Sequence, residues 1–170
     1  MKNKIGLIIS VVLLATSGVF FVRRYKEINA NNVQVIEKTI RLNQLVHAHN
    51  IDFKIYNSSL KTKDDEVELR VKMYIKQHGN LDFGQKKNNP NYIENMWFEA
   101  PYSLSNSIVK AYDKNGKNVT YLSKLVHAEQ PVTLVTTLPK KEYDSAEKTP
   151  RFTFIVPDGK QYVKYSLLIS

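Results

Sequence analysis

The sequence predicts an all-β chain in which an N-terminal transmembrane helix precedes one antiparallel β-sandwich. Three observations predict this class. Residues 5–22, IGLIISVVLLATSGVFFV, form an uncharged apolar run, and residues 66–77, EVELRVKMYIKQ, alternate apolar with mostly charged side chains. Turn signals separate further β-rich runs. Without its first 27 residues, the 170-residue chain keeps about the size of a single domain.

The first 27 residues consist of a basic head, the apolar run and a basic stop. As a helix, residues 5–22 would span roughly 27 Å at about 1.5 Å per residue, close to the hydrocarbon thickness of a bilayer. The residues that follow suit the membrane interface, because basic side chains extend toward water and an aromatic ring is favoured there. These residues are Arg23, Arg24, Tyr25 and Lys26.

A signal-peptide interpretation competes with the anchor. Residues 5–14 would be its apolar core, and Ala15-Thr16-Ser17 would supply the small residues that a signal peptidase reads. The apolar run, however, continues as far as Val22, whereas a signal peptide usually turns polar near its cleavage site. We therefore expect an uncleaved anchor.

The orientation of the anchor follows from weaker signals. Lys2 and Lys4 precede the run and three basic residues follow it, so the positive-inside rule does not decide. The short basic head looks like that of an export signal, and all-β domains are common on cell surfaces. We expect a single-pass protein of the cell membrane with its C-terminal domain outside. A cytoplasm-facing scaffold of a membrane complex is the alternative.

Residues 28–32 read as a polar linker, and residues 33–170 read as the sandwich. The alternation in residues 66–77 predicts a strand with one buried and one solvated face. Asn115-Gly116 and Pro157-Asp158-Gly159 are turn sequences. The expected strands cover residues 33–36, 39–46, 51–57, 66–77, 106–113, 117–122, 132–138, 150–156 and 160–169.

Two segments do not follow the strand pattern. Residues 78–101, HGNLDFGQKKNNPNYIENMWFEAP, read as one long irregular connection, and such connections often carry function in compact domains. Residues 140–148 read either as a turn of helix or as a charged loop.

The order of these motifs is similar to that of a known class of domains. A strand ending in the polar bend NSS is followed by VELRVKMYIK, by the hairpin AYDKNGKNVTYL and by the closing FTFIVPDGKQYVKYSLLI. Over roughly residues 33–170, this pattern resembles the immunoglobulin-like domains of unknown function on Gram-positive surface proteins and lipoproteins. The resemblance implies an exported, non-enzymatic sandwich and brings no binding residues. The chain departs from the lipoprotein members because it has no cysteine to lipidate.

Composition excludes several classes of function. The lack of cysteine excludes a disulfide framework, a thiolate metal site and a cysteine nucleophile. The formal net charge is +9, and the first 27 residues contribute five basic residues and one acidic residue to it. The mild basic excess of the remainder favours anionic surfaces such as lipid headgroups or wall polymers, and it does not indicate nucleic-acid binding.

No motif predicts catalysis or a cofactor. A zinc site could be drawn only from residues without the fixed spacing of such sites, namely His47 and His49 with Asp52 and either His78 or His127. The carboxylates of Asp64-Asp65-Glu66 lie in a charged loop without the shielded pocket that a general acid needs. We expect no metal, no cofactor and no enzyme. A membrane-tethered enzyme with a His/carboxylate site is the alternative.

Residues 78–102 also hold the best candidates for a partner contact. Exposed aromatic rings beside lysines suit an unidentified protein, a glycan or an anionic wall polymer. The candidates are Phe83, Lys86, Lys87, Tyr92 and Trp97. The alternative is that Trp97 and Phe98 fill one end of the sandwich core.

Overall fold

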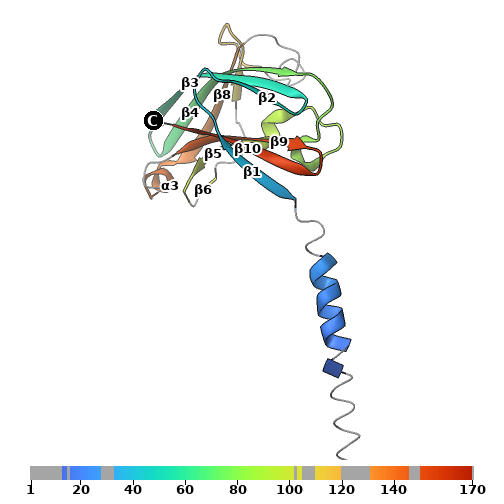
Figure 1. Ribbon diagram of the computed structural model, residues 1–170. Helices are drawn as coiled ribbons and strands as arrows, with labels where there is room; N and C mark the ends of the chain where they lie inside the picture. Colours follow the sequence, from blue (N-terminus) through green and yellow to red (C-terminus); the bar gives the residue numbers. More distant parts are fainter. Residues whose placement is uncertain are drawn as a thin grey trace, which may run out of the picture. The chain divides into compact units, whose positions relative to one another are not determined.

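The computed structural model describes residues 13–14, 16–27, 33–101, 103–104, 110–119, 131–145 and 150–169. The chain divides into two compact units, Met1–Gln34 and Val35–Ser170. The first contains a helical segment, and the second contains the strands (Figure 1).

In the first unit, residues 16–27 are helical, as are Leu13 and Leu14. Among the described residues, no helix combines the length and the apolar character needed to cross a membrane. Most of the predicted anchor core, residues 5–12 and 15, lies outside the described residues, as does the whole predicted linker 28–32. Near the C-terminal end of the helix, Arg23 and Arg24 each lie 3.5 Å from the Glu27 carboxylate.

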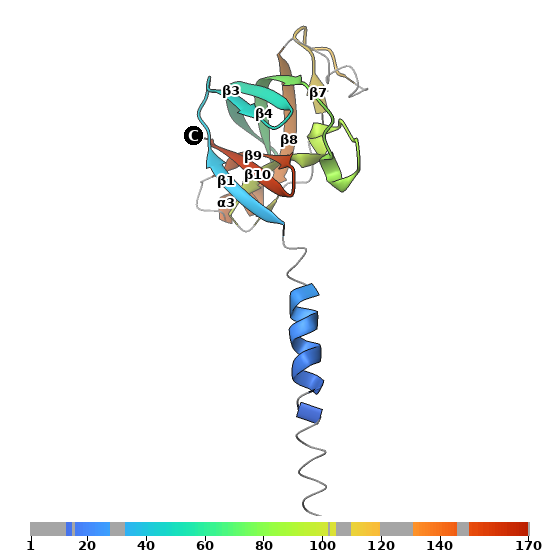
Figure 2. The same ribbon diagram turned by 45° about the vertical axis from the view of Figure 1, so that its right-hand side comes forward.

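Within its described residues, the second unit is a β-sandwich of two five-stranded sheets, whose layers are visible in Figures 1 and 2. The first sheet has the order β1-β10-β9-β5-β6, with β1 (Gln34–Thr39), β10 (Gln161–Leu168), β9 (Arg151–Asp158), β5 (Met96–Ala100) and β6 (Ser103–Leu104). The second has the order β2-β3-β4-β8-β7, with β2 (Leu45–Ala48), β3 (Ile51–Lys63), β4 (Glu66–Gln77), β8 (Val132–Pro139) and β7 (Lys110–Tyr112).

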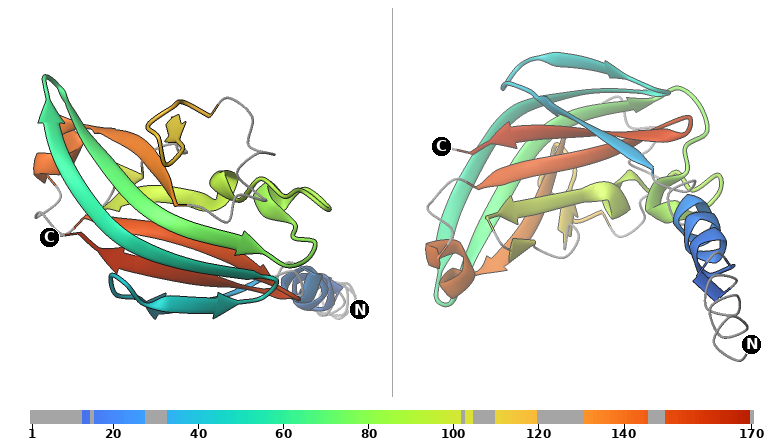
Figure 3. Two further views of the ribbon diagram at one scale, coloured as in Figure 1. Left: turned by 90° about the horizontal axis from the view of Figure 1, so that it is seen from above. Right: turned by 60° about the horizontal axis from the view of Figure 1, so that its bottom comes forward.

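The long antiparallel hairpin of β3 and β4 curves across the sandwich (Figure 3). Strand β4 coincides with the predicted strand 66–77, because its alternation matches the two sides of a sheet. Its five apolar side chains are at most 2% exposed: Val67, Leu69, Val71, Met73 and Ile75. A register shift between Ile55 and Asn57 interrupts the pairing of β3 with β4.

An aromatic cluster joins the two sheets at the centre of the core. The ring of Phe53 in β3 lies 5.2 Å from the rings of Phe154 in β9 and Tyr165 in β10. Both pairs meet edge to face, which is a favoured arrangement of aromatic rings. Phe53 and Phe154 are fully buried.

The N-terminal strands differ from the prediction. Residues 34–39 form one strand, and residues 40–44 form a turn where a strand at 39–46 was expected. Asn43 adopts φ 63°, and its backbone N–H donates to the carbonyl of Ile55 at 2.7 Å. Asparagine tolerates this left-handed conformation better than most residues, which is why the turn forms there.

Two further expectations are corrected, and one open alternative is decided. Residues 78–101 are not wholly irregular, because they contain β5 and two short 3-10 helices, η1 (Phe83–Gln85) and η2 (Tyr92–Asn95). The helical alternative holds at α3 (Lys140–Ser145). The expected strand at 117–122 is reduced, within the described residues, to a single bridge between Tyr112 and Asn118, and residues 120–122 lie outside them.

Candidate functional site

Two of the predicted contact residues, Phe83 and Tyr92, point their rings inward. Phe83 and Tyr92 are 0% and 1% exposed. The Phe83 ring stacks on Phe154 with 5.9 Å between centroids, and Tyr92 meets Phe83 edge to face at 6.5 Å. Burial raises the pKa of the Tyr92 phenol. The prediction that Phe83 and Tyr92 contact a partner is wrong, because both rings belong to the core.

The other predicted contact residues lie at the surface. Lys86 and Lys87 are exposed, and the Lys86 Nζ lies 3.4 Å from Glu94 Oε2. Trp97 is half-buried opposite Thr153, whereas Phe98 is fully buried. Adjacent residues of a strand point to opposite faces, so the core-filling alternative holds for Phe98 and not for Trp97.

Polar side chains order the connection between η1 and η2. The Glu94 carboxylate accepts hydrogen bonds from the side-chain amides of Asn89 at 3.1 Å and Asn91 at 2.8 Å. The Asn95 side chain accepts from the Gly84 N–H at 2.8 Å and donates to a β9 carbonyl at 3.0 Å. Gly84 has φ +60°, and a Cβ there would lie 1.9 Å from Glu94 Oε2. These hydrogen bonds order the connection and tie it to β9.

Of the residues considered for a zinc site, the structure brings His47, His78 and Asp52 together. His47 Nδ1 lies 2.8 Å from Asp52 Oδ1, and His78 Nε2 lies 2.7 Å from Asp52 Oδ2. His49 is separate, because β2 ends at Ala48 and the His49 ring instead lies 3.6 Å from Asp158.

Within the described residues, no group of three or more His, Cys, Asp or Glu side chains could hold a metal ion. His127 lies outside the described residues. The Asp52 carboxylate therefore acts as a bridge between the β2 edge and the segment that follows β4.

We expect Asp52→Asn to lower the free energy of unfolding at pH 7 by about 1 kcal/mol. Burial acts to raise the pKa of Asp52, but hydrogen bonds from His78 and His47 outweigh it and hold the pKa below the ordinary 3.8. A carboxyl group with a depressed pKa stabilises the fold above its unfolded pKa, and this contribution is lost as the pH falls through the folded pKa.

Urea denaturation between pH 7 and pH 3 measures this effect. The difference between wild type and Asp52→Asn should shrink below about pH 4. Asp65→Asn is the matched control, since Asp65 lies in the exposed β3–β4 turn. A difference that stays constant across this range would contradict the assigned bridge.

The outer side of the second sheet is basic and carries tyrosines. Strands β2, β3, β4, β8 and β7 turn most of their apolar residues inward, and seven Lys or Arg face outward against three Asp or Glu. We call this surface the basic face. Its charged residues are Lys54, Lys61, Lys63, Arg70, Lys72, Lys76 and Lys110, with Asp52, Glu66 and Glu68. Its tyrosines are Tyr56, Tyr74 and Tyr112.

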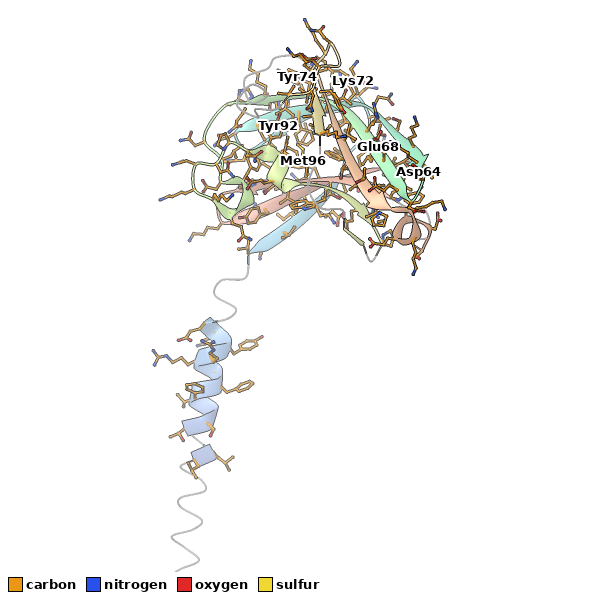
Figure 4. The ribbon with its side chains drawn as sticks, turned by 180° about the vertical axis from the view of Figure 1, so that it is seen from behind. Asp64, Glu68, Lys72, Tyr74, Tyr92 and Met96 are labelled. Carbon is orange, nitrogen blue, oxygen red and sulfur yellow. The ribbon has the colours of Figure 1, made fainter. Side chains whose placement is uncertain are left out.

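Figure 4 shows Glu68, Lys72 and Tyr74 along the outer side of the sandwich, with Tyr92 and Met96 in its interior. Two of the three acidic groups are already engaged, since Glu68 accepts from Arg70 Nε at 2.6 Å and Asp52 bridges two histidines. In the sequence, the charged residues that alternate with apolar ones in residues 66–77 indicate part of this face. The sequence alone predicts only a solvated surface here, because the neighbouring strands that widen this face are distant in the chain.

Comparisons with known proteins address the fold alone. No protein-family model matches the chain. No curated protein matches it either. The chain is similar to the crystal structure of an uncharacterized β-sandwich protein from Clostridium difficile 630, with a TM-score of 0.51 and 12% sequence identity, over 81% of this chain and 97% of that one. This similarity confirms the predicted β-sandwich, and the more specific immunoglobulin-like assignment stays a prediction.

Proposed function

We propose that this chain is a single-pass membrane protein that displays one immunoglobulin-like β-sandwich outside the cell and binds an anionic polymer without catalysis. The observation that carries the proposal is the basic face, where seven cationic side chains stand against three acidic ones. Clustering on one face matters more than net charge, because a concentrated patch attracts polyanions that scattered charges do not.

The strand order supports the immunoglobulin-like part of the proposal. Immunoglobulin domains place strands A-B-E-D in one sheet and C-F-G in the other. The order β3-β4-β8-β7 corresponds to A-B-E-D, and β5-β9-β10 corresponds to C-F-G. Strands β1 and β2 are then additions at the two sheet edges, and β6 extends the sheet beyond β5.

The proposal of a membrane anchor is based on the sequence of the first unit. Residues 5–22 carry no charge, and basic residues follow immediately. Arg23, Arg24, Tyr25 and Lys26 would then lie at the membrane interface, where basic and aromatic side chains are favoured. Anchoring beside the cell surface would keep the basic face near anionic surface polymers and raise its effective concentration toward them.

The geometry of a sheet suits a polymer better than a small ion. Residues two apart on a strand lie roughly 6.7 Å apart, and adjacent strands lie about 4.8 Å apart. Arg70 and Lys72 of β4, and Lys61 and Lys63 of β3, therefore form an array that can meet anionic groups at repeated intervals. The tyrosines on the same face, Tyr56, Tyr74 and Tyr112, offer apolar surface to sugar or polyol units.

Binding to polyanions tests this proposal. Full-length protein in a non-ionic detergent should be retained on beads carrying polyphosphate or dextran sulfate, should pass through neutral dextran, and should elute as salt rises. The triple variant Lys54→Glu, Lys61→Glu and Lys63→Glu reverses charge on the basic face and should lose most retention. Equal retention of this variant and wild type would refute the basic face as the binding surface.

A matched control carries the same change of charge elsewhere. Lys86→Glu, Lys87→Glu and Lys160→Glu reverse three exposed lysines outside the basic face. This variant should keep its retention. If it loses retention while the basic-face variant does not, the contact lies at the lysine pair predicted from sequence.

Protease treatment of intact cells tests the orientation. The sandwich should be degraded, and a soluble cytoplasmic protein in the same cells should survive. A sandwich that is cut only after the cells are lysed would support the cytoplasm-facing alternative.

A further inference from the structure

The basic face is hollowed near β7. The hollow has a volume of about 420 Å³ and lies where β4, β8 and β7 meet the turn that follows β7. Its walls carry cationic and hydroxyl groups together: Arg70, Lys72, Tyr112, Asp113, Lys114 and Thr133.

Strand register places three hydrogen-bond donors in a row along one wall. Lys72 of β4 is opposite Thr133 of β8, and Thr133 is opposite Tyr112 of β7. Since adjacent strands lie about 4.8 Å apart, an ammonium group, a hydroxyl and a phenol follow one another across the sheet. Each of them can donate a hydrogen bond to an anion.

The turn after β7 adds a fourth donor at the rim, Lys114. Asp113 Oδ1 accepts the backbone N–H groups of Asn115 at 2.8 Å and Lys117 at 2.9 Å. Gly116 completes the turn with φ +76°, a conformation that other residues rarely adopt. The two N–H groups also offset part of the negative charge that Asp113 brings into the hollow.

The charges of the hollow leave a small positive excess. The Arg70 guanidinium is engaged through Nε with Glu68 at 2.6 Å, which leaves its Nη groups available. Within the described part of the chain, Lys72 and Lys114 have no acidic partner. Set against Asp113, the two lysines leave one uncompensated positive charge, which a singly charged anion matches better than a doubly charged one.

We propose that this hollow binds a phosphodiester group of the anionic polymer, and this proposal rests on the polymer-binding function above. A phosphodiester carries one negative charge and two free oxygens. Arg70 and Lys72 reach it from β4, and Lys114 reaches it from the turn. The volume exceeds that of the phosphate, so the sugar or polyol on one side fits against the Tyr112 ring.

Titration of the full-length, ¹⁵N-labelled protein in a non-ionic detergent tests the site, with glycerophosphoglycerol as the probe. The amide signals of Gly116 and Thr133 should shift until they saturate. Lys72→Gln and Lys114→Gln should each weaken the apparent affinity about fivefold, as expected for the loss of one partly exposed charge contact. Lys160→Gln, at an exposed lysine outside the basic face, should leave the affinity unchanged.

Equal affinity of wild type and both hollow variants overturns the proposal. An affinity no higher than that of glycerol alone also overturns it. Inorganic sulfate binding as tightly as the diester would show a general anion site and would contradict the assignment to a phosphodiester.

The experiments can refute the basic face and the hollow independently of each other. If the triple variant in β3 loses polyanion retention while the hollow variants titrate like wild type, the hollow is refuted and the basic face stands. If glycerophosphoglycerol saturates the hollow while the triple variant keeps its retention, the hollow stands as a local site and the extended basic face is refuted.

Discussion

Val71→Asp should abolish the folded sandwich or lower its free energy of unfolding by more than about 4 kcal/mol. Val71 is 1% exposed and lies at the middle of β4, with Ser58 of β3 and Leu134 of β8 as its neighbours. A carboxylate there would lose its hydration without gaining a partner, which is among the most destabilising changes a core can undergo. Chemical denaturation followed by circular dichroism measures the effect.

Lys72→Asp is the control for this change, one position further along the same strand. Lys72 is exposed on the basic face, so its replacement should change the free energy of unfolding by less than about 0.5 kcal/mol. The two substitutions introduce the same side chain on opposite sides of one strand. Similar damage from both would mean that β4 does not separate a buried face from a solvated one.

Phe154→Ala should lower the free energy of unfolding by about 3–5 kcal/mol, the usual range for removing a fully buried phenylalanine. The Phe154 ring contacts Phe53 of the opposite sheet and stacks on Phe83 of η1. Its loss therefore leaves a cavity between the sheets and removes the support of the segment that contains η1 and η2.

Two measurements distinguish the global loss of stability from the local opening of the segment that contains η1 and η2. Urea denaturation gives the global loss of stability, and hydrogen exchange should show the backbone amides of residues 83–95 opening more than those of β4. Ile155→Ala is the control, because Ile155 is only half-buried on the outer side of β9. A loss as large for Ile155→Ala would place the core on the wrong side of that strand.

The basic face shows why a functional surface is harder to find in a sequence than a strand. Glu68, Arg70 and Lys72 alternate with apolar residues in an uninterrupted run, so their outward direction could be predicted. Across the sheet, Lys72 lies opposite Thr133, and Thr133 lies opposite Tyr112; these two residues are about sixty and forty positions further along the chain than Lys72. Strand pairing over such separations leaves no local pattern, and the hollow could not be predicted.

The aromatic residues of 78–102 illustrate the same limit. Phe83 and Tyr92 occur among lysines and asparagines, a composition typical of an exposed loop. The polar side chains of Asn95 and Glu94, however, bond within the segment and to β9, which lets it turn both rings into the core. Burial here depends on contacts with Phe154, and no periodicity in the segment indicates them.

By itself, the sequence determined the all-β class, the strand at 66–77 with its two faces, the two strands predicted at 150–156 and 160–169 around a turn, and the lack of any cysteine chemistry. These features depend on the alternation of side chains along a strand and on composition, which are local properties. The tertiary structure alone decided the partners of Asp52, the burial of Phe83 and Tyr92, and the meeting of Lys72, Thr133 and Tyr112. The physical reason is that sheet register and core packing join residues from distant parts of the chain, and their free energy depends on neighbours that no local pattern specifies.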